Sequence, residues 1–334
     1  MNPAKRLALP QNLAEAAESE GRQHWLTTVL PEVVAQARNR WSLTIGEPFQ
    51  PGGQTAWVAP ARAAACADLT LTRTDPALTR TDPALARTDL TLARADLVLK
   101  VAWPHPEAAR EADGLRAWAG HGAVRLHAAH DFGAARALLI ERCRPGTELF
   151  RRPEPEQDTV IAALLLRLWI PPDPGHLFPS LEQMCRSWAG QFEQRAAAKA
   201  AKVTRAAKAA KAPPLDSGLV RAGIALFREL PATADTQVLL CTDLHAGNVL
   251  AAAREPWLVI DPKPHVGDPA YDPLQHLLNC GERLHADPRG LARRMASLLD
   301  LDPDRVLSWL FARCVQESAE WPALAEVART IAPA

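Results

Sequence analysis

This chain of 334 residues lacks an excess of charge of either sign and lacks closely spaced cysteines. Lysine plus arginine and aspartate plus glutamate both number 38, so the formal net charge is zero. Without a basic excess, the chain is not expected to bind nucleic acid or anionic membranes through charge alone. The six cysteines are scattered and form no Cys-x-x-Cys pair, which argues against a zinc site and for a reducing compartment.

Long apolar runs are missing as well. Residues 1–20 lack the apolar core of a signal peptide. The longest apolar run, residues 162–170, is interrupted by Arg167 and is too short to span a bilayer. We therefore expect a soluble, cytoplasmic protein that works without nucleic acid or membrane, and we expect it to be a monomer. Its length allows two domains or one large two-lobed domain.

The most informative stretch of the chain is residues 239–263. Its two apolar runs have the pattern of short buried strands, so the polar residues beside them are expected at strand ends, where a loop presents them to a ligand. Those polar residues are Asp243, Asn248 and Asp261. An aspartate followed five residues later by an asparagine has the spacing of a kinase catalytic loop. There the aspartate accepts the proton of the attacking hydroxyl, and the asparagine and a later aspartate hold magnesium.

A glycine pair, Gly52 and Gly53, lies between two strand-like segments. Glycine lets the backbone approach a ligand closely, and such a turn can cradle a phosphate. A plain hairpin turn explains the pair without any ligand, so phosphate contact is the less favoured interpretation of these two residues alone.

Lys100 lies in a segment that is apolar at both odd and even positions, residues 97–101, which predicts a buried strand. A helix is expected over residues 107–120, and it contains Glu107 and Glu111. A strand lysine paired with a helix glutamate is how kinases fix the lysine on the phosphates of a nucleotide. Either glutamate could instead be solvated, and spacing alone does not choose between them.

The next two strands are expected to be joined by the turn Asp131-Phe132-Gly133. This triplet matches a kinase metal-binding motif, but it lies between strands far upstream of the catalytic loop, so we predict a hairpin turn. The strand pattern ends after Glu141. We place an interlobe hinge there, with backbone groups near Glu141 and Cys143 available to an adenine.

Two segments have the character of insertions. Residues 66–96 carry a seven-residue repeat with one aspartate per copy, and prolines in consecutive copies exclude a continuous helix. We expect a tolerated surface loop between two strands, with the binding of a cationic ligand as the less favoured alternative. Residues 196–211 are almost entirely alanine, lysine and arginine, and we expect a solvated helical extension rather than a nucleic-acid site.

The order of these parts carries more information than any one of them. With the glycine turn, strand lysine, helix glutamate, hinge and catalytic loop in sequence, the chain resembles the aminoglycoside phosphotransferase family, and within it the streptomycin 6-kinase and hydroxyurea phosphotransferase group. The likeness covers about residues 10–320 outside the two insertions. It is carried by Leu99-Lys100-Val101-Ala102-Trp103, Glu141-Arg142-Cys143-Arg144-Pro145-Gly146, Ile260-Asp261-Pro262-Lys263 and residues 243–248 and 267–272.

The resemblance implies an α+β, bilobal protein-kinase-like fold. Its small antiparallel-sheet N-terminal lobe would span residues 1–143, and its mostly helical C-terminal lobe residues 144–334. It also implies an ATP-dependent phosphotransferase that uses Mg²⁺ and modifies a hydroxyl group of a small molecule, an antibiotic of the streptomycin or hydroxyurea type.

Carried over residue by residue, the resemblance assigns a role to each candidate. Asp243 is implied to be the catalytic base, and Asp272 a structural residue. The remaining roles are metal binding by Asn248 and Asp261, phosphate binding by Lys100 held by Glu111, phosphate covering by Gly52 and Gly53, and adenine contact by Glu141 and Cys143.

The chain departs from the family at Cys241 and Thr242, where members usually have His-Gly before the catalytic aspartate. That histidine is a scaffold residue, so its absence is expected to loosen the loop without removing the base. The departure motivates an alternative, a catalytically silent kinase-like protein that binds nucleotide. A small-metabolite kinase acting on a sugar or choline is a third possibility.

The substrate is not decided by the residues. The guanidinium groups of streptomycin would need carboxylates or carbonyls, whereas hydroxyurea would need only a small polar pocket. The C-terminal helices offer four acids, whose usual explanation is a solvated helix surface: Glu282, Asp287, Glu317 and Glu320.

Overall fold

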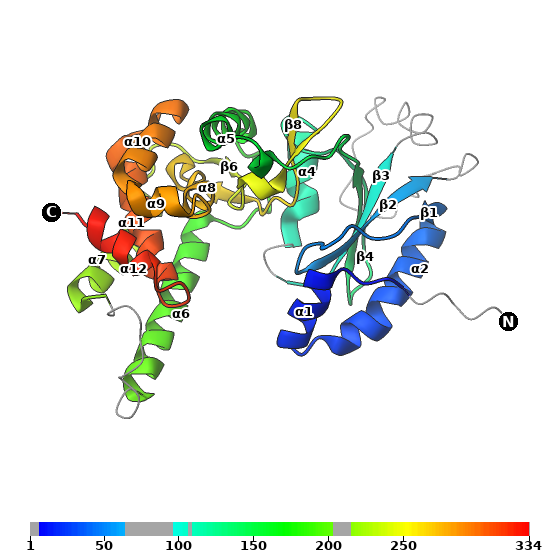
Figure 1. The fold of residues 1–334 in the computed structure, drawn as a ribbon, viewed down its shortest axis with the longest axis horizontal. Coiled ribbons are helices and arrows are strands. Elements are labelled where there is room, and N and C mark those ends of the chain that lie inside the picture. Colours follow the sequence, from blue (N-terminus) through cyan, green and yellow to red (C-terminus); the bar gives the residue numbers. More distant parts are fainter. Residues whose placement is uncertain (1–6, 64–95, 106–108, 203–214, 334) are drawn as a thin grey trace. The chain divides into compact units, whose positions relative to one another are not determined.

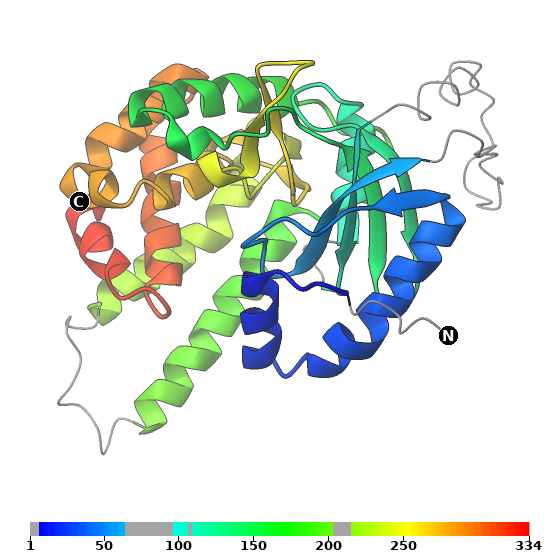
Figure 2. The same cartoon turned by 45° about the vertical axis from the view of Figure 1, so that its right-hand side comes forward.

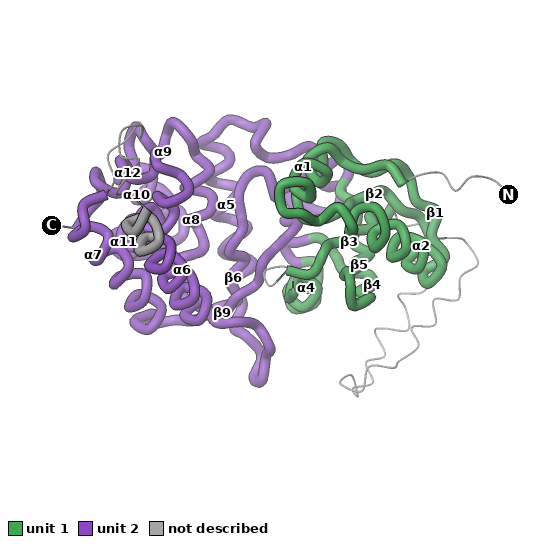
Figure 3. The backbone as a smooth tube through the Cα atoms, turned by 90° about the horizontal axis from the view of Figure 1, so that it is seen from below, with its two compact units in different colours: residues 1–120, 124–143 green, residues 121–123, 144–334 purple. Residues whose placement is uncertain are grey.

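The computed structural model of the chain describes residues 7–63, 96–105, 109–202 and 215–333. These residues form two compact units, which are coloured separately in Figure 3. Unit 1 comprises Met1–Gly120 and Val124–Cys143, and unit 2 comprises His121–Ala123 and Arg144–Ala334.

Unit 1 contains a five-stranded antiparallel sheet in the order β1-β2-β3-β5-β4 (Figure 1). The strands are β1 (Leu43–Ile45), β2 (Ala56–Ala63), β3 (Leu97–Ala102), β4 (Leu126–Asp131) and β5 (Arg136–Glu141). All six residues of the central strand β3 are buried, as its apolar pattern at odd and even positions predicts. In the register of the sheet, Lys100 of β3 lies between Val58 of β2 and Leu138 of β5.

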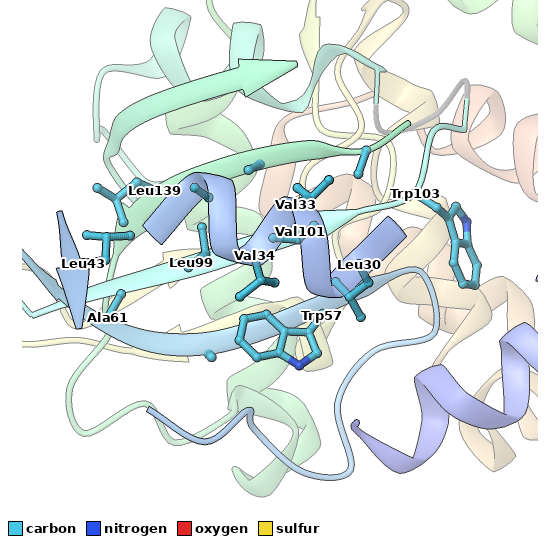
Figure 4. Close-up of a cluster of buried hydrophobic side chains, with 14 of the residues drawn as sticks. Leu30, Val33, Val34, Leu43, Trp57, Ala61, Leu99, Val101, Trp103 and Leu139 are labelled. Atoms are coloured by element: carbon cyan, nitrogen blue, oxygen red, sulfur yellow. The ribbon is translucent and has the colours of Figure 1, made fainter. Parts of the chain in front are cut away.

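Helices of unit 1 contribute a core on one face of this sheet. They are α1 (Gln11–Ser19), a π-helical turn (Trp25–Val29) and α2 (Leu30–Arg40), whereas α4 (Glu111–Trp118) lies on the other face. Because side chains alternate along a strand, Leu99 and Val101 of β3 point to the same face, where they join Val33 of α2 and Trp57 of β2 in a buried cluster (Figure 4). Lys100 points to the opposite face, toward α4.

Unit 2 is mostly helical and carries two small antiparallel sheets, β6 with β9 and β7 with β8. The strands are β6 (Val238–Leu240), β7 (Val249–Ala251), β8 (Trp257–Val259) and β9 (His265–Gly267). The helices are α5 (Glu154–Leu168), α6 (Leu181–Lys202), α7 (Ser217–Glu229), α8 (Leu274–Leu278), α9 (Glu282–Ala286), α10 (Pro288–Leu299), α11 (Pro303–Glu317) and α12 (Leu324–Ile331). Helix α11, orange-red in Figure 2, packs against α7, α10 and α12, and its Trp309 and Phe311 are fully buried.

The expected fold class is confirmed: one unit is built on an antiparallel sheet and the other is mostly helical. The repeat, apart from its last residue Asp96, lies outside the described residues. Because β2 pairs directly with β3, the repeat connects two neighbouring antiparallel strands. Residues 196–202 continue helix α6, and the rest of the alanine- and lysine-rich stretch lies outside the described residues.

Helix α4 begins at Glu111, four residues later than the expected helix, and residues 106–108 lie outside the described part of the chain. Among the helices that the structure describes, none is both long enough and apolar enough to cross a membrane.

Candidate active site

Lys100 and Glu111 form a buried ion pair in unit 1. Lys100 lies in the middle of β3, and Glu111 is the first residue of α4. The Nζ atom of Lys100 lies 2.7 Å from Oε1 and 2.8 Å from Oε2 of Glu111, and the two side chains are 7% and 3% exposed. An ammonium on an apolar strand costs desolvation energy that only a well-placed partner offsets, so Glu111 fixes the position of the ammonium.

The pair lines a pocket of about 310 Å³ that belongs to unit 1. Trp103 and Leu138 contribute apolar surface to the pocket, and Arg136 contributes charge. Of the described residues, those of the glycine turn and of the end of β5 do not line it. The structure therefore brings the expected lysine and glutamate together, but it does not bring the other expected nucleotide contacts to the same pocket.

The glycine turn is attached to the start of α1. Gly52 has φ +75°, and a Cβ atom on it would lie 2.5 Å from Cβ of Pro10. The side-chain amide of Asn12 donates to the carbonyl oxygen of Gly52 at 2.8 Å, whereas a Cβ atom on Gly53 would meet open space. Backbone conformation and close packing thus require glycine at position 52, and the role of the turn on phosphates stays a prediction.

At the end of β5, several polar groups near the expected hinge are used within unit 1. The amide N–H of Glu141 donates to the carbonyl of Arg125 at 2.9 Å, and the carboxylate of Glu141 accepts from the amide of Arg125 at 3.0 Å. The amide of Arg142 donates to the carbonyl of Asp96 at 3.1 Å. Cys143, which follows, is buried. Adenine binding by Glu141 and Cys143 stays a prediction.

The triplet Asp131-Phe132-Gly133 is a hairpin turn between β4 and β5, as predicted. Asp131 pairs with Arg136 in the register of the sheet and accepts a 2.9 Å hydrogen bond from its guanidinium. The carboxylate of Asp131 also accepts from the amide of Gly133 at 2.8 Å. Its oxygens thus close the turn.

In unit 2, the loop after β6 brings Asp243 and Asn248 together. The side-chain NH₂ of Asn248 donates to the carbonyl of Asp243 at 3.0 Å, and its backbone N–H donates to the carbonyl of His245 at 2.9 Å. The carbonyl of Asn248 accepts from the amide of Ile260 at 2.9 Å, which joins this loop to the end of β8. The five-residue spacing of Asp243 and Asn248 therefore corresponds to a short, internally hydrogen-bonded loop. Asp261 directly follows Ile260, which is bonded to that loop.

Two residues of this region have backbone conformations that favour glycine. Thr242 has φ +52° and Asp261 has φ +53°. Such conformations cost about 1–3 kcal/mol each and are concentrated at functional sites, where the surrounding structure holds them. Thr242 directly precedes the expected catalytic aspartate, and Asp261 follows β8.

The sequence-based reasoning missed the role of Lys263, which contacts the expected base. Its Nζ atom lies 2.6 Å from Oδ2 of Asp243, and the two side chains are 26% and 15% exposed. The backbone of Lys263 is also attached to this loop, because its N–H donates to the carbonyl of Cys241 at 2.9 Å. The sequence offered one indication that Lys263 belongs to the site. It lies two residues after Asp261, within a motif that carried the family resemblance.

His245 is a second residue that the sequence-based reasoning left out. Its Nδ1 accepts from the amide of Gly247 at 3.1 Å, so its proton resides on Nε2. Burial lowers the pKa of His245 below its usual value, and the charges of Asp243, Asp261 and Lys263 all act on it. The imidazole is therefore neutral near pH 7 and lies among the charged residues of the site.

The expected structural aspartate, Asp272, anchors the loop. One carboxylate oxygen accepts from the amide of Thr242 at 2.7 Å, and the other accepts from the amide of Cys241 at 3.0 Å and from the indole of Trp169 at 2.9 Å. Burial raises the pKa of Asp272 to about 6, although these three hydrogen bonds favour the ionised form. Two consecutive amides before Asp243 are thus fixed by one side chain.

The expected loosening of the loop at Cys241 and Thr242 is not seen. The amides of both residues are bonded to Asp272, and the hydroxyl of Thr242 donates to the carbonyl of Lys263 at 2.5 Å. Nδ1 of His265 lies 3.0 Å from the same carbonyl. Side chains from β9 and from the loop itself therefore hold the positions that follow β6.

The oxygen atoms of Asn248 and Asp261 are suitable for magnesium, which prefers carboxylate and carbonyl oxygens. The NH₂ group of Asn248 is already used by the loop, which leaves its amide oxygen for a ligand. A second group of potential metal ligands, Asp158, His276 and Cys280, is buried elsewhere in unit 2. Its carboxylate is already bonded by His276 and by two arginines, Arg283 and Arg294, so its donor set fits an ion-pair network rather than a cation.

The model of the aminoglycoside/hydroxyurea antibiotic resistance kinase family matches residues 87–324, which is more than half of the chain. The chain belongs to this family. It is 34% identical over 273 residues to a streptomycin 6-kinase of Streptomyces griseus, covering 79% of this chain and 83% of that protein. It is 33% identical over 293 residues to a hydroxyurea phosphotransferase of Kitasatospora aureofaciens, covering 86% and 72%.

The resemblance found in the sequence is thereby confirmed. As a member of this antibiotic resistance kinase family, the chain is a phosphotransferase. The fold is similar to that of Plasmodium vivax ethanolamine kinase, with a TM-score of 0.50 at 15% identity, over 86% of this chain and 77% of that one. At this identity the similarity concerns the fold, and it agrees with the expected kinase-like architecture.

Proposed function

We propose that this family member transfers the γ-phosphoryl group of ATP to a hydroxyl group of a small antibiotic of the streptomycin or hydroxyurea type. The names of its relatives support this substrate class. The structural observation that carries the proposal is the loop of unit 2, in which Asn248 is hydrogen-bonded to Asp243 and Lys263 is paired with it. A carboxylate held at a loop, next to oxygen ligands for a metal, is the arrangement that phosphoryl transfer requires.

Each residue then has a chemical task. The carboxylate of Asp243 accepts the proton of the attacking hydroxyl and orients that hydroxyl. The amide oxygen of Asn248 and the carboxylate of Asp261 would hold Mg²⁺, which supplies neutralisation of phosphate charge when it is bound. Lys100, fixed by Glu111, binds nucleotide phosphates. Most of the rate enhancement is expected to come from positioning and electrostatics, because the protein forms no covalent intermediate.

The acids considered for a cationic substrate are largely engaged within unit 2. Glu317 pairs with Arg313 at 3.0 Å, Glu320 is bonded by Arg195, and Asp287 accepts from an amide at the start of α10. Recognition of guanidinium groups by these acids is therefore not favoured by the structure. We keep both antibiotic types in the proposal, and substrate turnover decides between them.

The test is consumption of ATP by the purified chain with streptomycin, hydroxyurea, choline and simple sugars as acceptors. We expect turnover with one of the two antibiotics and a loss of about 10²–10⁴-fold in kcat for Asp243→Asn, with Mg-ATP binding retained. Asp235→Asn changes an exposed aspartate of unit 2 and serves as the matched control. Full activity of Asp243→Asn, or no transfer to any acceptor despite a thermal shift with Mg-ATP, would contradict the proposal.

A further inference from the structure

Lys263 is attached to the loop of the expected base at three points. Its amide donates to the carbonyl of Cys241 at 2.9 Å, its carbonyl accepts from the hydroxyl of Thr242 at 2.5 Å, and its ammonium lies 2.6 Å from Oδ2 of Asp243. The first two contacts fix the backbone of Lys263, and the third fixes its side chain. The segment after β8 therefore presents one defined cation to Asp243.

This ion pair has little value for stability. Both side chains are partly exposed, and ion pairs between partly exposed groups contribute about 0–1 kcal/mol. A lysine also loses considerable side-chain entropy when it is held in one position. Three hydrogen bonds that fix such a lysine beside the base are better explained by a task in the reaction.

If Asp243 is the base, this ammonium lies close to the transferred group. A base lies about 2.6–3.2 Å from the hydroxyl that it deprotonates, and the attacking oxygen lies about 3–3.5 Å from the atom that it attacks. Lys263 engages Oδ2 of Asp243, and Oδ1 of Asp243 has no hydrogen-bond partner among the described residues. The substrate hydroxyl is therefore expected on Oδ1, with the phosphoryl group within a few ångströms of the ammonium.

We propose that Lys263 is a further catalytic residue of the phosphoryl transfer, with its ammonium holding the Asp243 carboxylate and stabilising negative charge on the transferred phosphoryl group. The inference rests on the proposed function. As the new oxygen–phosphorus bond forms and the bond to the β-phosphate oxygen breaks, the proton of the hydroxyl moves to Asp243 and ADP leaves. Lys263 exchanges no proton in this step, and its charge acts on the charge spread over the phosphoryl oxygens in the transition state.

Steady-state kinetics of Lys263→Met, Lys263→Ala and Lys263→Arg test this role. For Lys263→Met we expect kcat to fall about 10²–10³-fold, as for the removal of other transition-state donors, with the KM for ATP within about threefold of the wild-type value. Lys263→Arg keeps the charge and is expected to recover at least tenfold of the loss. Propylammonium in the assay is expected to restore part of the activity of Lys263→Ala, because a free amine can occupy the vacated position.

Thr242→Val is the matched control, because it removes the hydrogen bond from the Thr242 hydroxyl to the backbone carbonyl of Lys263 and leaves the ammonium in place. Its kcat is expected to fall much less than that of Lys263→Met. The inference would be overturned, while the proposed function stands, if Lys263→Met keeps its activity. It would also be overturned if the variants still bind Mg-ATP but neither arginine nor propylammonium reverses the loss in kcat. Wild-type protein that transfers no phosphoryl group overturns both. Where Lys263→Met fails to fold, the arginine variant and the amine titration of Lys263→Ala give the decision.

Discussion

The hydroxyl of Thr242 donates a 2.5 Å hydrogen bond to the backbone carbonyl of Lys263, twenty-one residues further along the chain. Thr242 has φ +52°, a conformation in which a branched side chain is costly. The family resemblance implies glycine at this position, where this chain has threonine. Its hydroxyl connects the residue before Asp243 to the segment after Asp261, a tie that glycine cannot provide.

Replacement of Thr242 tests this tie. Thr242→Val keeps the shape and the strained backbone but lacks the hydroxyl, so we expect kcat to fall up to about tenfold, the equivalent of one hydrogen bond of about 0.5–1.5 kcal/mol. Thr242→Ser keeps the hydroxyl and is expected to remain within about twofold of the wild type, since its contact is preserved. Steady-state kinetics under identical conditions give the comparison. Equal rates for the valine and serine variants would show that the hydroxyl does not matter.

Loss of one partner of the Lys100–Glu111 pair is expected to destabilise the protein. Lys100→Met leaves a carboxylate buried without its cation, and we expect the free energy of unfolding to fall by about 3–5 kcal/mol. Denaturant unfolding monitored by tryptophan fluorescence measures this change. Lys100→Met should also lose affinity for ATP if the ammonium binds phosphates.

A double variant separates these two effects. Lys100→Met with Glu111→Leu replaces the ion pair by apolar side chains of similar size, and stability is expected to recover to within about 1–2 kcal/mol of the wild type, since a buried pair and its apolar replacement often have similar stability. ATP binding, measured by calorimetry, is not expected to recover. Recovery of both properties would assign the pair a purely structural role.

The periodicity of the sequence predicted the central strand and its burial, because both faces of β3 are covered and both carry apolar residues. The spacing suggested that a helix glutamate pairs with Lys100, but it could not choose between Glu107 and Glu111. The choice depends on where α4 begins, and Glu111 is its first residue. A glutamate within reach of the strand could be identified only once that helix was placed.

The contact between Lys263 and Asp243 was not predictable from local pattern. It arises because the segments after β6 and β8 fold back on each other, held by the amide of Lys263 on Cys241 and the hydroxyl of Thr242. The positive φ angles of Thr242 and Asp261 are part of this folding, and a threonine in particular is not expected to adopt such a conformation. From the sequence, Thr242 was expected to loosen the loop, whereas in the structure its hydroxyl bonds the carbonyl of Lys263.

Asp272 is expected to make stability depend on pH between about 4 and 6. Its pKa is raised to about 6 in the folded protein, whereas an unfolded aspartate titrates near 3.9. In this window the folded state retains a proton that the unfolded state has lost, so the free energy of unfolding falls as pH rises, by about 2 kcal/mol across the window and about 3 kcal/mol over the whole titration. Above about pH 7 both states are ionised at this residue, and its contribution no longer changes.

The comparison with Asp272→Asn isolates this dependence, because the asparagine does not titrate and all other groups are shared. Urea unfolding of both proteins at several pH values should show the wild type losing about 2 kcal/mol more than the variant between pH 4 and 6.5. The variant is expected to start from a lower stability, since its NH₂ group would face N–H donors. Parallel curves for the two proteins would mean that Asp272 is ionised throughout this range.

The buried carboxylate of Asp158 is expected to be a structural centre of unit 2 that takes no metal. Burial opposes its ionisation, but hydrogen bonds from His276, Arg283 and Arg294 hold its pKa well below the usual range. The ionised carboxylate therefore stabilises the folded protein fully at any pH above the pKa of aspartate in the unfolded chain. This stabilisation is lost only as pH falls through the lower pKa that Asp158 has in the folded protein. At pH 7, Asp158→Asn removes the charge that holds Arg283 and Arg294, and because both arginines are partly exposed we expect a loss of about 1–3 kcal/mol in urea unfolding.

Zinc provides the second measurement on this cluster, because Cys280 lies near His276 and resembles a ligand. A carboxylate already bonded by two guanidinium groups has no charge left to attract a cation, and burial holds the thiol of Cys280 protonated by raising its pKa to about 12. The melting temperature of the wild type is therefore expected to be the same with zinc and with a chelator, and Cys280→Ser should behave alike. A rise in melting temperature with zinc that disappears in both Cys280→Ser and Asp158→Asn would instead show that the cation displaces the arginines from Asp158.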